Sequence, residues 1–299
     1  MKKQINEIGN EVIDLQIRAL KKLKNSINQS FNEAVKAISN CKSKVILCGV
    51  GKSGKIASKI SSTLSSVGTP SFSISANDCS HGDLGRITNQ DLIILISYSG
   101  NTNELKEIIK YAKSNKITLI GIVSNKNSVL YKSSNIKLLI PEVKESGFGI
   151  VPTSSTTAQL CLGDALSIAS MEKKKFGKMD FKKFHPAGNL GNKLKTAQDV
   201  MLTKNRIPFV NQNVIMKKAL KILNSKKLGF LVLTNDEGLN AGVFTDGDLK
   251  RLMQTKKTID NLKIKKFMTK KPYIVEKNTL ATDVLNLMNK KKNYKYLCL

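Results

Sequence analysis

Residues 92–102 read Leu92-Ile93-Ile94-Leu95-Ile96-Ser97-Tyr98-Ser99-Gly100-Asn101-Thr102, and this stretch decides the fold. Its first five residues are apolar on both faces, which is typical of a strand in a parallel sheet covered by helices on each side. The polar loop that follows leads into helical sequence. Because ligands bind at the carboxyl ends of strands in open α/β sheets, this loop is a candidate site.

Short apolar runs alternate with helical stretches from residue 44 onward, which predicts a layered α/β domain. The expected strands are 44–48, 71–75, 92–97, 118–123 and 136–140, and the expected helices are 53–66, 103–114 and 155–175. Residues 3–38 have apolar positions at helical spacing and no proline, so they predict one long helix or a helical pair. We expect residues 1–176 to form a doubly wound domain with a five-stranded parallel sheet and an N-terminal helix.

A turn-rich connection, residues 177–198, precedes an internal repeat. Val200-Met201-Leu202-Thr203 recurs as Phe267-Met268-Thr269, and residues 214–227 recur as 279–292. Each copy starts with a strand and an amphipathic helix, so we expect one module over 199–260 and a partial second module over 261–299. The second copy stops within its second strand, an end expected of either a natively short chain or a truncated gene product.

Composition excludes several classes of protein. The net charge of +28 comes mostly from dispersed lysines, with only four arginines, 5% aromatic residues and no tryptophan, which favours a solvated basic surface over nucleic-acid binding. No apolar run is long enough to span a bilayer and no secretory signal opens the chain, so we expect a soluble cytoplasmic protein. Five scattered cysteines without a CxxC motif are expected to be reduced.

A glycine loop, Gly49-Val50-Gly51-Lys52-Ser53-Gly54, follows a strand and opens a helix, the context in which a helix N-terminus binds phosphate. Ile46 stands where a P-loop would need glycine, so the motif is not a Walker A sequence. A dinucleotide site remains an alternative, because Asp78 lies near the end of the second expected strand.

Two hydroxyl-rich loops accompany the glycine loop. They are Ser97–Thr102 and Pro152-Thr153-Ser154-Ser155-Thr156-Thr157, and each precedes a helix. One such cluster is usually only a helix cap, but two together with a glycine loop favour a small phosphorylated polyol as ligand. Both histidines, His81 and His185, lie in glycine-rich turns, and Glu104 and Glu145 each lie next to a hydroxyl-rich loop.

The ordered motifs Gly-Val-Gly-Lys-Ser-Gly, His-Gly-Asp-Leu-Gly, Ser-Tyr-Ser-Gly-Asn-Thr-Asn-Glu, Pro-Thr-Ser-Ser-Thr-Thr and His-Pro-Ala-Gly-Asn-Leu-Gly resemble those of the D-arabinose 5-phosphate isomerases. The resemblance spans nearly the whole chain and implies a sugar isomerase (SIS) domain followed by two CBS modules. It also implies interconversion of D-ribulose 5-phosphate and D-arabinose 5-phosphate, which feeds synthesis of the octulosonate sugar of lipopolysaccharide. Ala187 and Asn189 depart from the family pattern, as does the short C-terminus.

By motif matching, the resemblance implies that Lys52, Glu104, Glu145 and His185 are the catalytic residues. Moving a carbonyl between C1 and C2 through a cis-enediol needs a base and a group that shuttles the oxygen proton. Glu104 and Glu145 are alternative bases, His185 or His81 is assigned to ring opening or oxygen proton transfer, and Lys52 to the enediolate or the phosphate. No metal or other cofactor is expected. The remaining expected substrate-binding residues are Gly51, Ser53, His81, Ser97, Ser99, Thr102, Ser154, Ser155 and Thr156.

Two other functions remain open at this point. One is a non-catalytic SIS/CBS sensor of sugar phosphates, and the other is the paralogous isomerase of sugar-alcohol catabolism. The resemblance also implies a homotetramer, in which His185 reaches the site of a neighbouring subunit, and a CBS pair that could bind a nucleotide.

Overall fold

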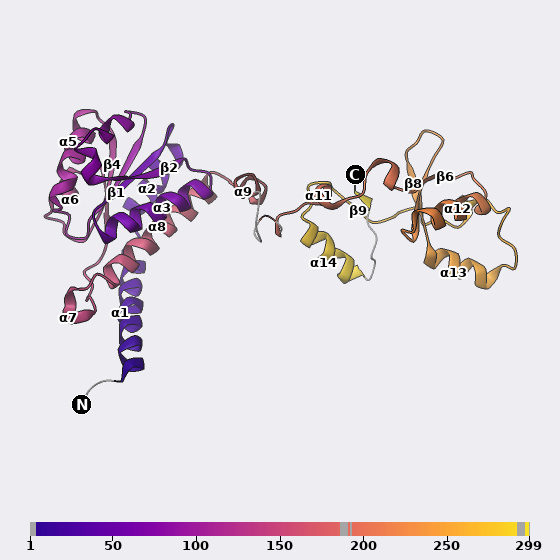
Figure 1. Ribbon diagram of the computed structural model, residues 1–299, viewed down its shortest axis with the longest axis horizontal. Helices are drawn as coiled ribbons and strands as arrows, with labels where there is room; N and C mark the ends of the chain where they lie inside the picture. Colours follow the sequence, from indigo (N-terminus) through magenta and orange to yellow (C-terminus); the bar gives the residue numbers. More distant parts are fainter. Residues whose placement is uncertain (1–3, 186–190, 192, 292–296, 299) are drawn as a thin grey trace. The chain divides into compact units, whose positions relative to one another are not determined.

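The computed structural model describes residues 4–185, 191, 193–291 and 297–298. It divides into two compact units, Met1–His185 and Pro186–Leu299 (Figure 1). No helix in the described part of the chain is both long and apolar enough to cross a membrane.

The first unit is an α/β domain built on one five-stranded sheet. Its strands are β1 Val45–Gly49, β2 Ser71–Ser75, β3 Leu92–Ile96, β4 Thr118–Val123 and β5 Ile136–Leu139. Its helices are α1 Ile5–Asn25, α2 Gln29–Asn40, α3 Lys52–Ser66, α4 Ala76–Cys79, α5 Lys106–Ser114, α6 Val129–Ser133, α7 Gly147–Ile150, α8 Ser154–Lys173 and α9 Lys178–Phe184, with the 3₁₀ turns η1 Asp83–Arg86 and η2 Asn103–Leu105.

The sheet is parallel throughout, in the order β2-β1-β3-β4-β5. Alternate residues of the central strands enter two separate cores, as in a sheet covered on both faces. Leu92, Ile94 and Ile96 pack with α1, α2, α3 and α8, whereas Ile93 and Leu95 pack with α4, α5 and α6. The predicted doubly wound, five-stranded parallel sheet is therefore confirmed, with strand ends shifted by at most one residue.

The N-terminal segment forms two helices rather than one. Between α1 and α2, Asn28 accepts a hydrogen bond from the backbone N–H of Ser30 and so caps the second helix. The predicted helix over 103–114 begins as the short 3₁₀ turn η2 before α5. Several short elements of this unit have no counterpart in the sequence prediction. They are α4, η1, α6, the left-handed turn α7 and helix α9, which lies in the expected connection.

Helices α3 and α8 lie side by side because Gly163 of α8 has no side chain. A Cβ at this position would come within 2.1 Å of Ile60 Cδ1. The two helices run in the same direction, since Ser53 contacts Gln159 near their starts and Lys174 donates to Thr69 just beyond their ends. Their N-termini therefore open at the same edge of the sheet.

The second unit contains a three-stranded sheet and a two-stranded sheet. Its elements are α11 Ala197–Val200, η3 Lys204–Arg206, β6 Phe209–Asn211, α12 Met216–Lys226, β7 Phe230–Thr234, β8 Asn240–Thr245, α13 Asp246–Thr255, η4 Ile264–Lys266, β9 Ile274–Val275, α14 Ala281–Lys291 and β10 Leu297–Cys298. Strands β6 and β7 are parallel, β7 and β8 are antiparallel, and β9 pairs with β10 in parallel. Tyr296 and Leu299 of the expected last strand lie outside the described residues, as do Ala187 and Asn189 of the connection.

The short segment that precedes each sequence repeat, residues 195–197 for the first copy and 262–264 for the second, is here called its entry segment. The two repeats exchange these entry segments. Ala281, at the start of α14, donates its backbone N–H to Lys195 O at 2.7 Å, and the equivalent Met216, at the start of α12, donates to Leu262 O at 2.8 Å. Ala197 N similarly donates to Thr279 O, and Ile264 N to Val214 O. The segment before each copy therefore pairs with the helix start of the other copy.

Candidate active site

A cavity of about 340 Å³ opens where α3 and α8 begin, beyond the carboxyl ends of the strands. Three motifs that are distant in sequence meet there: the glycine loop, the serine loop and the Pro-Thr-Ser-Ser-Thr run. The lining residues are Val50, Lys52, Ser53, Tyr98, Glu145, Ile150, Pro152, Ser155, Thr156 and Gln159. Of the sequence-predicted site residues, this cavity unites Lys52, Ser53, Glu145, Ser155 and Thr156.

The N-terminus of α3 has no side-chain cap, as is typical of helix N-termini that bind phosphate. Gly51 occupies the N-cap position at φ +58° and, having no side chain, forms no side-chain cap hydrogen bond to the first turn of the helix. The first amide groups of a helix lack intrahelical acceptors and carry partial positive charge. With the exposed Lys52 as the first helical residue, this end of α3 attracts an anion.

The start of α8, in contrast, is already occupied by a carboxylate. Glu145 Oε2 accepts hydrogen bonds from Thr153 N, Thr153 Oγ1 and Ser154 N at 2.8–3.1 Å, and Glu145 Oε1 accepts one from Ser155 N at 3.2 Å. Partial burial by itself raises the pKa of the Glu145 carboxyl, but the hydrogen bonds from Ser155, Thr153 and Ser154 outweigh burial and hold that pKa below its usual value. Glu145 is therefore an ionised cap of α8.

Gln159 is a site residue that the sequence analysis missed. It lies one turn into α8, is 1% exposed and lines the cavity. Its Oε1 accepts a hydrogen bond from Ser53 Oγ at 3.3 Å, while its Nε2 has no partner. If the amide is flipped, Nε2 donates to Ser53 and the carbonyl oxygen is the atom without a partner. A buried amide with one unpaired atom at a cavity wall has the chemistry to hydrogen-bond a ligand. The one signal in the sequence is that Gln159 lies three and four residues after Thr156 and Ser155, and therefore on the same face of the predicted helix.

The serine loop is folded upon itself around Gly100. Ser97 Oγ lies 2.7 Å from Thr102 Oγ1 and accepts a hydrogen bond from Gly100 N, and Ser99 Oγ accepts one from Asn101 N. Gly100 has φ +70°, and a Cβ there would lie 2.2 Å from Ser128 Oγ, so glycine is required. From this loop only Tyr98 lines the cavity, and its hydroxyl accepts a hydrogen bond from Val143 N. Ser97, Ser99 and Thr102 belong to the same loop as Tyr98, but they do not line the cavity.

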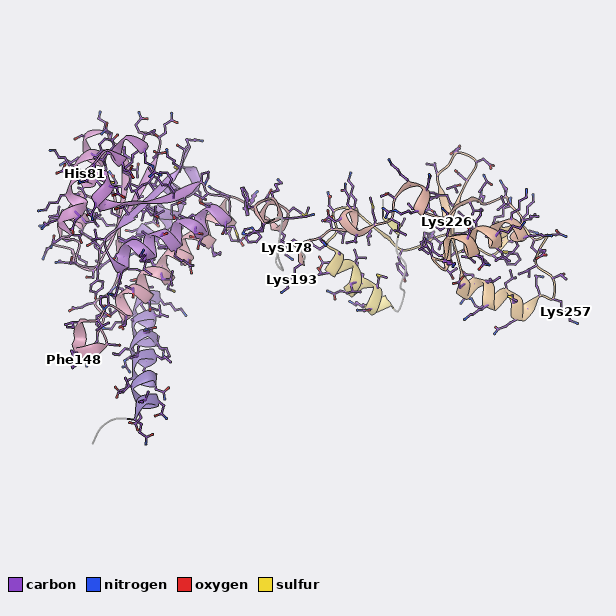
Figure 2. The ribbon with its side chains drawn as sticks, in the orientation of Figure 1. His81, Phe148, Lys178, Lys193, Lys226 and Lys257 are labelled. Carbon is purple, nitrogen blue, oxygen red and sulfur yellow. The ribbon has the colours of Figure 1, made fainter. Side chains whose placement is uncertain are left out.

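Glu104 and His81 are both exposed and do not line the cavity. Glu104 lies in η2, directly after the serine loop, and His81 follows α4 (Figure 2). Ser154 is buried at the start of α8, and its hydroxyl has no hydrogen-bond partner. Gly51, with its positive φ, shapes the loop before α3 but does not line the cavity.

His185 lies at the other end of α8 from Glu145. Its ring stacks on Phe181 with centroids 3.9 Å apart, and Nδ1 lies 3.0 Å from Phe181 O. The same helix, α9, is held near the end of α8 by a stack of Phe184 on Phe176, with centroids 5.8 Å apart. Since α8 has 20 residues, it separates His185 from Glu145 by about 30 Å. Within one subunit, the structure does not bring His185 into the cavity.

Cys48 and Cys79 are buried near the glycine loop. Burial, with a smaller contribution from the neighbouring Cys79, raises the pKa of the Cys48 thiol to about 12, and burial raises that of Cys79 to about 11. Both are protonated core residues at neutral pH. Among the described residues, no three His, Cys, Asp or Glu side chains gather as metal ligands.

Comparison with known proteins identifies the family to which this chain belongs. Residues 37–169 match the SIS domain family. Arabinose 5-phosphate isomerase KdsD of Yersinia pestis is 40% identical over 284 residues, which cover 94% of this chain and 87% of that protein. The protein of the same name from Francisella tularensis is 39% identical, with the same coverage of both chains. The chain therefore belongs to the arabinose 5-phosphate isomerase family.

Among solved structures, the Escherichia coli CFT073 protein c3406 in complex with arabinose 5-phosphate is similar to this chain, with a TM-score of 0.57 and 34% identity. The match covers 62% of this chain and 100% of the c3406 chain.

Proposed function

We propose that this protein is an arabinose 5-phosphate isomerase that interconverts D-ribulose 5-phosphate and D-arabinose 5-phosphate. The observation that carries the proposal is the cavity between the N-termini of α3 and α8, which unites Lys52, Ser53, Glu145, Ser155, Thr156 and Gln159. The membership of this chain in the arabinose 5-phosphate isomerase family, and the arabinose 5-phosphate complex of the E. coli CFT073 protein, support a pentose phosphate as substrate.

The substrate phosphate binds at the start of α3. The start of α8 is less suitable, because the ionised Glu145 already uses its amide groups. The start of α3 has only Gly51 as N-cap and has Lys52 as its first residue, so free N–H donors and a cation are available together. Ser53 and Thr156 supply hydroxyl groups in the cavity wall, whereas Ser97, Ser99 and Thr102 shape the neighbouring serine loop.

The base for carbon is Glu104 rather than Glu145. A general base works best when its pKa is near the working pH, whereas Glu145 has a lowered pKa and accepts several hydrogen bonds. From D-ribulose 5-phosphate, the base removes a proton from C1 and returns it to C2 of the cis-enediol, while a second group moves a proton from O1 to O2. Lys52 stabilises the enediolate if the sugar lies across its ammonium group. Glu145 keeps α8 and Thr153 in position.

Gln159 binds a sugar hydroxyl. Its amide has one hydrogen-bonding atom without a partner, and it shares the cavity wall with Ser53 and Thr156. Pairing that buried atom with the substrate removes the cost of leaving it unsatisfied in the empty cavity.

The site is completed by a second subunit. His185 lies about one α8 length from Glu145 of its own chain, so its proposed role in ring opening or oxygen proton transfer requires the cavity of a neighbour. His81 is exposed on the same domain and is the alternative group for this step. We propose a homotetramer built from such site-sharing dimers.

The deciding experiment is to incubate the full chain with D-ribulose 5-phosphate, D-glucosamine 6-phosphate and sedoheptulose 7-phosphate in turn, with and without a chelator. Turnover of the pentulose phosphate alone, unchanged by the chelator, is expected. Inactivity on every pentulose phosphate would support a sensor instead. Loss of activity with chelator and its recovery with a divalent ion would overturn the metal-free mechanism.

We also propose that the second unit is a pair of CBS modules, one over residues 199–260 and the other over 261–299. Support comes from the strand, helix, two strands and helix of the first copy, and from the exchanged entry segments that relate the two copies. In the first copy, the Thr245 hydroxyl and the Asp248 carboxylate hydrogen-bond to each other in a capping box at the start of α13. A ribose would have to displace this contact. Calorimetry of the full chain with AMP and ATP tests nucleotide binding, and no heat of binding would refute that role.

A further inference from the structure

Tyr98 lines the cavity, but the catalytic steps proposed above do not use it. It belongs to the serine loop, two residues after the end of β3 and six residues before the proposed base Glu104. The loop that carries the base therefore also places a phenol in the wall of the cavity.

The Tyr98 side chain is held in place by its own domain. Its ring is half-buried and packs against the core between the sheet and helices α1, α2, α3 and α8. Its backbone carbonyl accepts hydrogen bonds from Ser124 N at 2.9 Å and from Ser124 Oγ at 2.7 Å. A donor fixed in this way needs no reorganisation when charge develops on a bound molecule, which is what makes such a group effective in catalysis.

The hydroxyl group of Tyr98 accepts a hydrogen bond and has a donor to spare. Val143 N donates to the Tyr98 oxygen at 3.0 Å, and the hydroxyl donates to no acceptor among the described residues. A phenol carries one O–H donor, so this donor is the group that Tyr98 offers to a ligand. Because the hydrogen bond from Val143 polarises the hydroxyl, it strengthens Tyr98 as a donor.

The proposed isomerisation needs a donor of this kind at a sugar oxygen. When the base removes the proton from C1 of D-ribulose 5-phosphate, the C–H electron pair forms the C1–C2 double bond and the carbonyl electrons move to O2. Hydrogen-bond donors stabilise the charge that grows on O2. The ionised Glu145 can only accept hydrogen bonds, and a phenol is a stronger donor than the alkyl hydroxyls of Ser53 and Thr156.

From these observations we propose that the Tyr98 hydroxyl donates a hydrogen bond to O2 of the sugar and stabilises the enediolate. The proton stays on Tyr98, and O2 takes its proton from the second group of the proposed mechanism. The inference rests on the proposed function and adds a catalytic residue to the same reaction. It makes one hydrogen-bond chain, from Val143 N–H through Tyr98 to the reacting oxygen.

The competing role for Tyr98 is structural. Val143 lies two residues before Glu145, so the Tyr98 oxygen could serve only to hold the segment that leads to the cap of α8. A structural role uses the phenol oxygen as an acceptor, whereas the catalytic role uses its O–H as a donor. Changes that affect the two properties differently separate the two roles.

The first experiment measures steady-state kinetics of the full chain. Tyr98→Phe should lower kcat for D-ribulose 5-phosphate roughly a hundredfold, the lower end of the range for one lost oxyanion donor, with KM changed less than about threefold. Tyr111→Phe is the matched control, since it also removes one hydroxyl, which donates to Ile87 O at 3.1 Å, and it should keep near-native kcat. Circular dichroism and thermal melting check that both variants fold. Near-native kcat in Tyr98→Phe, or equal losses in the two variants, would overturn the proposal.

The second experiment measures binding and needs no turnover. The hydroxamate 4-phospho-D-erythronohydroxamate imitates the charge of the enediolate, whereas D-arabinitol 5-phosphate has the phosphate and the hydroxyls but no carbonyl. By calorimetry, Tyr98→Phe should weaken binding of the hydroxamate roughly a hundredfold and binding of the alditol less than about threefold. Equal weakening of both ligands would assign Tyr98 to the phosphate or to structure, and would overturn the proposal.

The third experiment replaces Tyr98 with 3-fluorotyrosine, whose hydroxyl is a stronger donor and a weaker acceptor than that of tyrosine. At a pH at which the fluorinated phenol stays protonated, the affinity for the hydroxamate should rise. Unchanged or weaker binding would show that the oxygen serves only as acceptor for Val143 N. A wild-type chain inactive on every pentulose phosphate would refute the proposed function and this role together, whereas an active wild type matched by Tyr98→Phe would refute the role of Tyr98 alone.

Discussion

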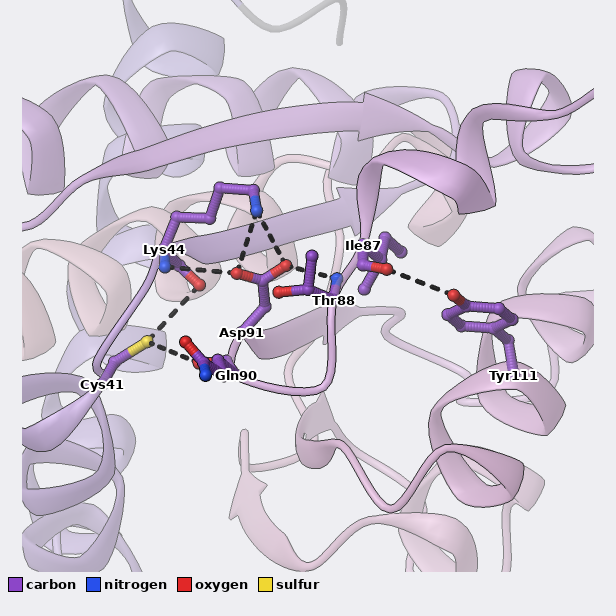
Figure 3. A network of polar contacts seen from close by, with 7 residues as sticks. All are labelled: Cys41, Lys44, Ile87, Thr88, Gln90, Asp91 and Tyr111. Carbon is purple, nitrogen blue, oxygen red and sulfur yellow. Dashed lines mark hydrogen bonds and ion pairs between the residues drawn. The ribbon is translucent and has the colours of Figure 1, made fainter.

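Two carboxylates at opposite edges of the same sheet, Asp91 and Glu145, are both held ionised, but by different means. At the amino edge, Lys44 Nζ lies 3.0 and 2.9 Å from the two oxygens of Asp91, whose side chain is fully buried, and Thr88 N donates to the same carboxylate (Figure 3). At the carboxyl edge, Glu145 has only amide and hydroxyl donors and faces a cavity. The positive charge of Lys44 pairs with Asp91 and leaves no space there for a ligand. Among the described residues, Glu145 has no such cationic partner, and its site is open to a ligand.

The network at the amino edge connects two loops. Cys41 Sγ lies 3.4 Å from Lys44 O and 3.8 Å from Gln90 O, and Tyr111 donates its hydroxyl to Ile87 O (Figure 3). Burial alone would raise the pKa of Asp91, but hydrogen bonds from Thr88 and Lys44 hold it below its usual value. We therefore assign this network to stability, and the glutamates at the other edge to catalysis and its support.

The largest expected effect is on catalysis at the open edge. Glu104→Gln should lower kcat by roughly a hundredfold or more, because the amide cannot take the carbon-bound proton. Glu107→Gln, one turn further along the same face and also exposed, is the matched control and should keep near-native turnover. Steady-state kinetics with D-ribulose 5-phosphate measures both. Near-native kcat in Glu104→Gln would remove this residue from the mechanism.

His185→Ala should lower kcat by a similar factor, and it also tests the shared site. Each variant alone should keep about a hundredth of the wild-type kcat or less. Subunits mixed after dissociation should regain a larger fraction of wild-type activity, since some sites would then contain both intact residues. A mixture as inactive as its components would indicate that the two residues act in one chain or not at all.

At the closed edge, Asp91→Asn should reduce the free energy of unfolding by about 3 kcal/mol, the scale of breaking a buried ion pair, while kcat stays unchanged. The folded-state pKa of Asp91 lies below its unfolded value of about 3.9. The stabilisation is therefore complete above the unfolded value and is lost as pH falls through the folded pKa. Urea unfolding between pH 2 and 7 should show wild type and variant converging in acid. A constant difference would mean that Asp91 stabilises through packing.

Glu145→Gln is expected to have a smaller effect on kcat than Glu104→Gln, about tenfold, because an amide oxygen still accepts hydrogen bonds at the start of α8. The pH dependence of the remaining activity should keep the shape of the wild-type profile. An altered acidic limb of that profile would show that Glu145 titrates during turnover and is the base after all.

The smallest expected effect is at Gln159. Gln159→Ala should raise KM for D-ribulose 5-phosphate about tenfold with little change in kcat, because a neutral hydrogen bond to substrate is lost in both ground and transition states. Gln159→Glu keeps the size but adds a negative charge near the phosphate, and should raise KM further. An unchanged KM in both variants would assign Gln159 to the packing of α3 against α8.

The sequence predicts the sheet well, because Leu92–Ile96 is apolar at every position, short and rich in isoleucine, as is typical of a strand buried on both faces. It also predicts that Lys52, Glu145 and Thr156 come together, since glycine and hydroxyl loops after parallel strands share one edge. It does not predict Gln159, whose role depends on the approach of α3 and α8 at Gly163. Nor does it show that Glu145 caps α8, because that contact closes a loop of eight to ten residues through backbone amides.

The exchanged entry segments of the second unit also constrain the order of events during synthesis. The first turn of α12 needs the carbonyl of Leu262, which the ribosome adds roughly 45 residues after Met216. At about 5–20 residues per second, that delay lasts about 2–9 s. During this interval the rest of the first repeat is being made while Leu262 is still absent, so the start of α12 in the nascent chain lacks this backbone hydrogen bond. Chaperone binding and misassembly between neighbouring nascent chains should therefore concentrate in this window.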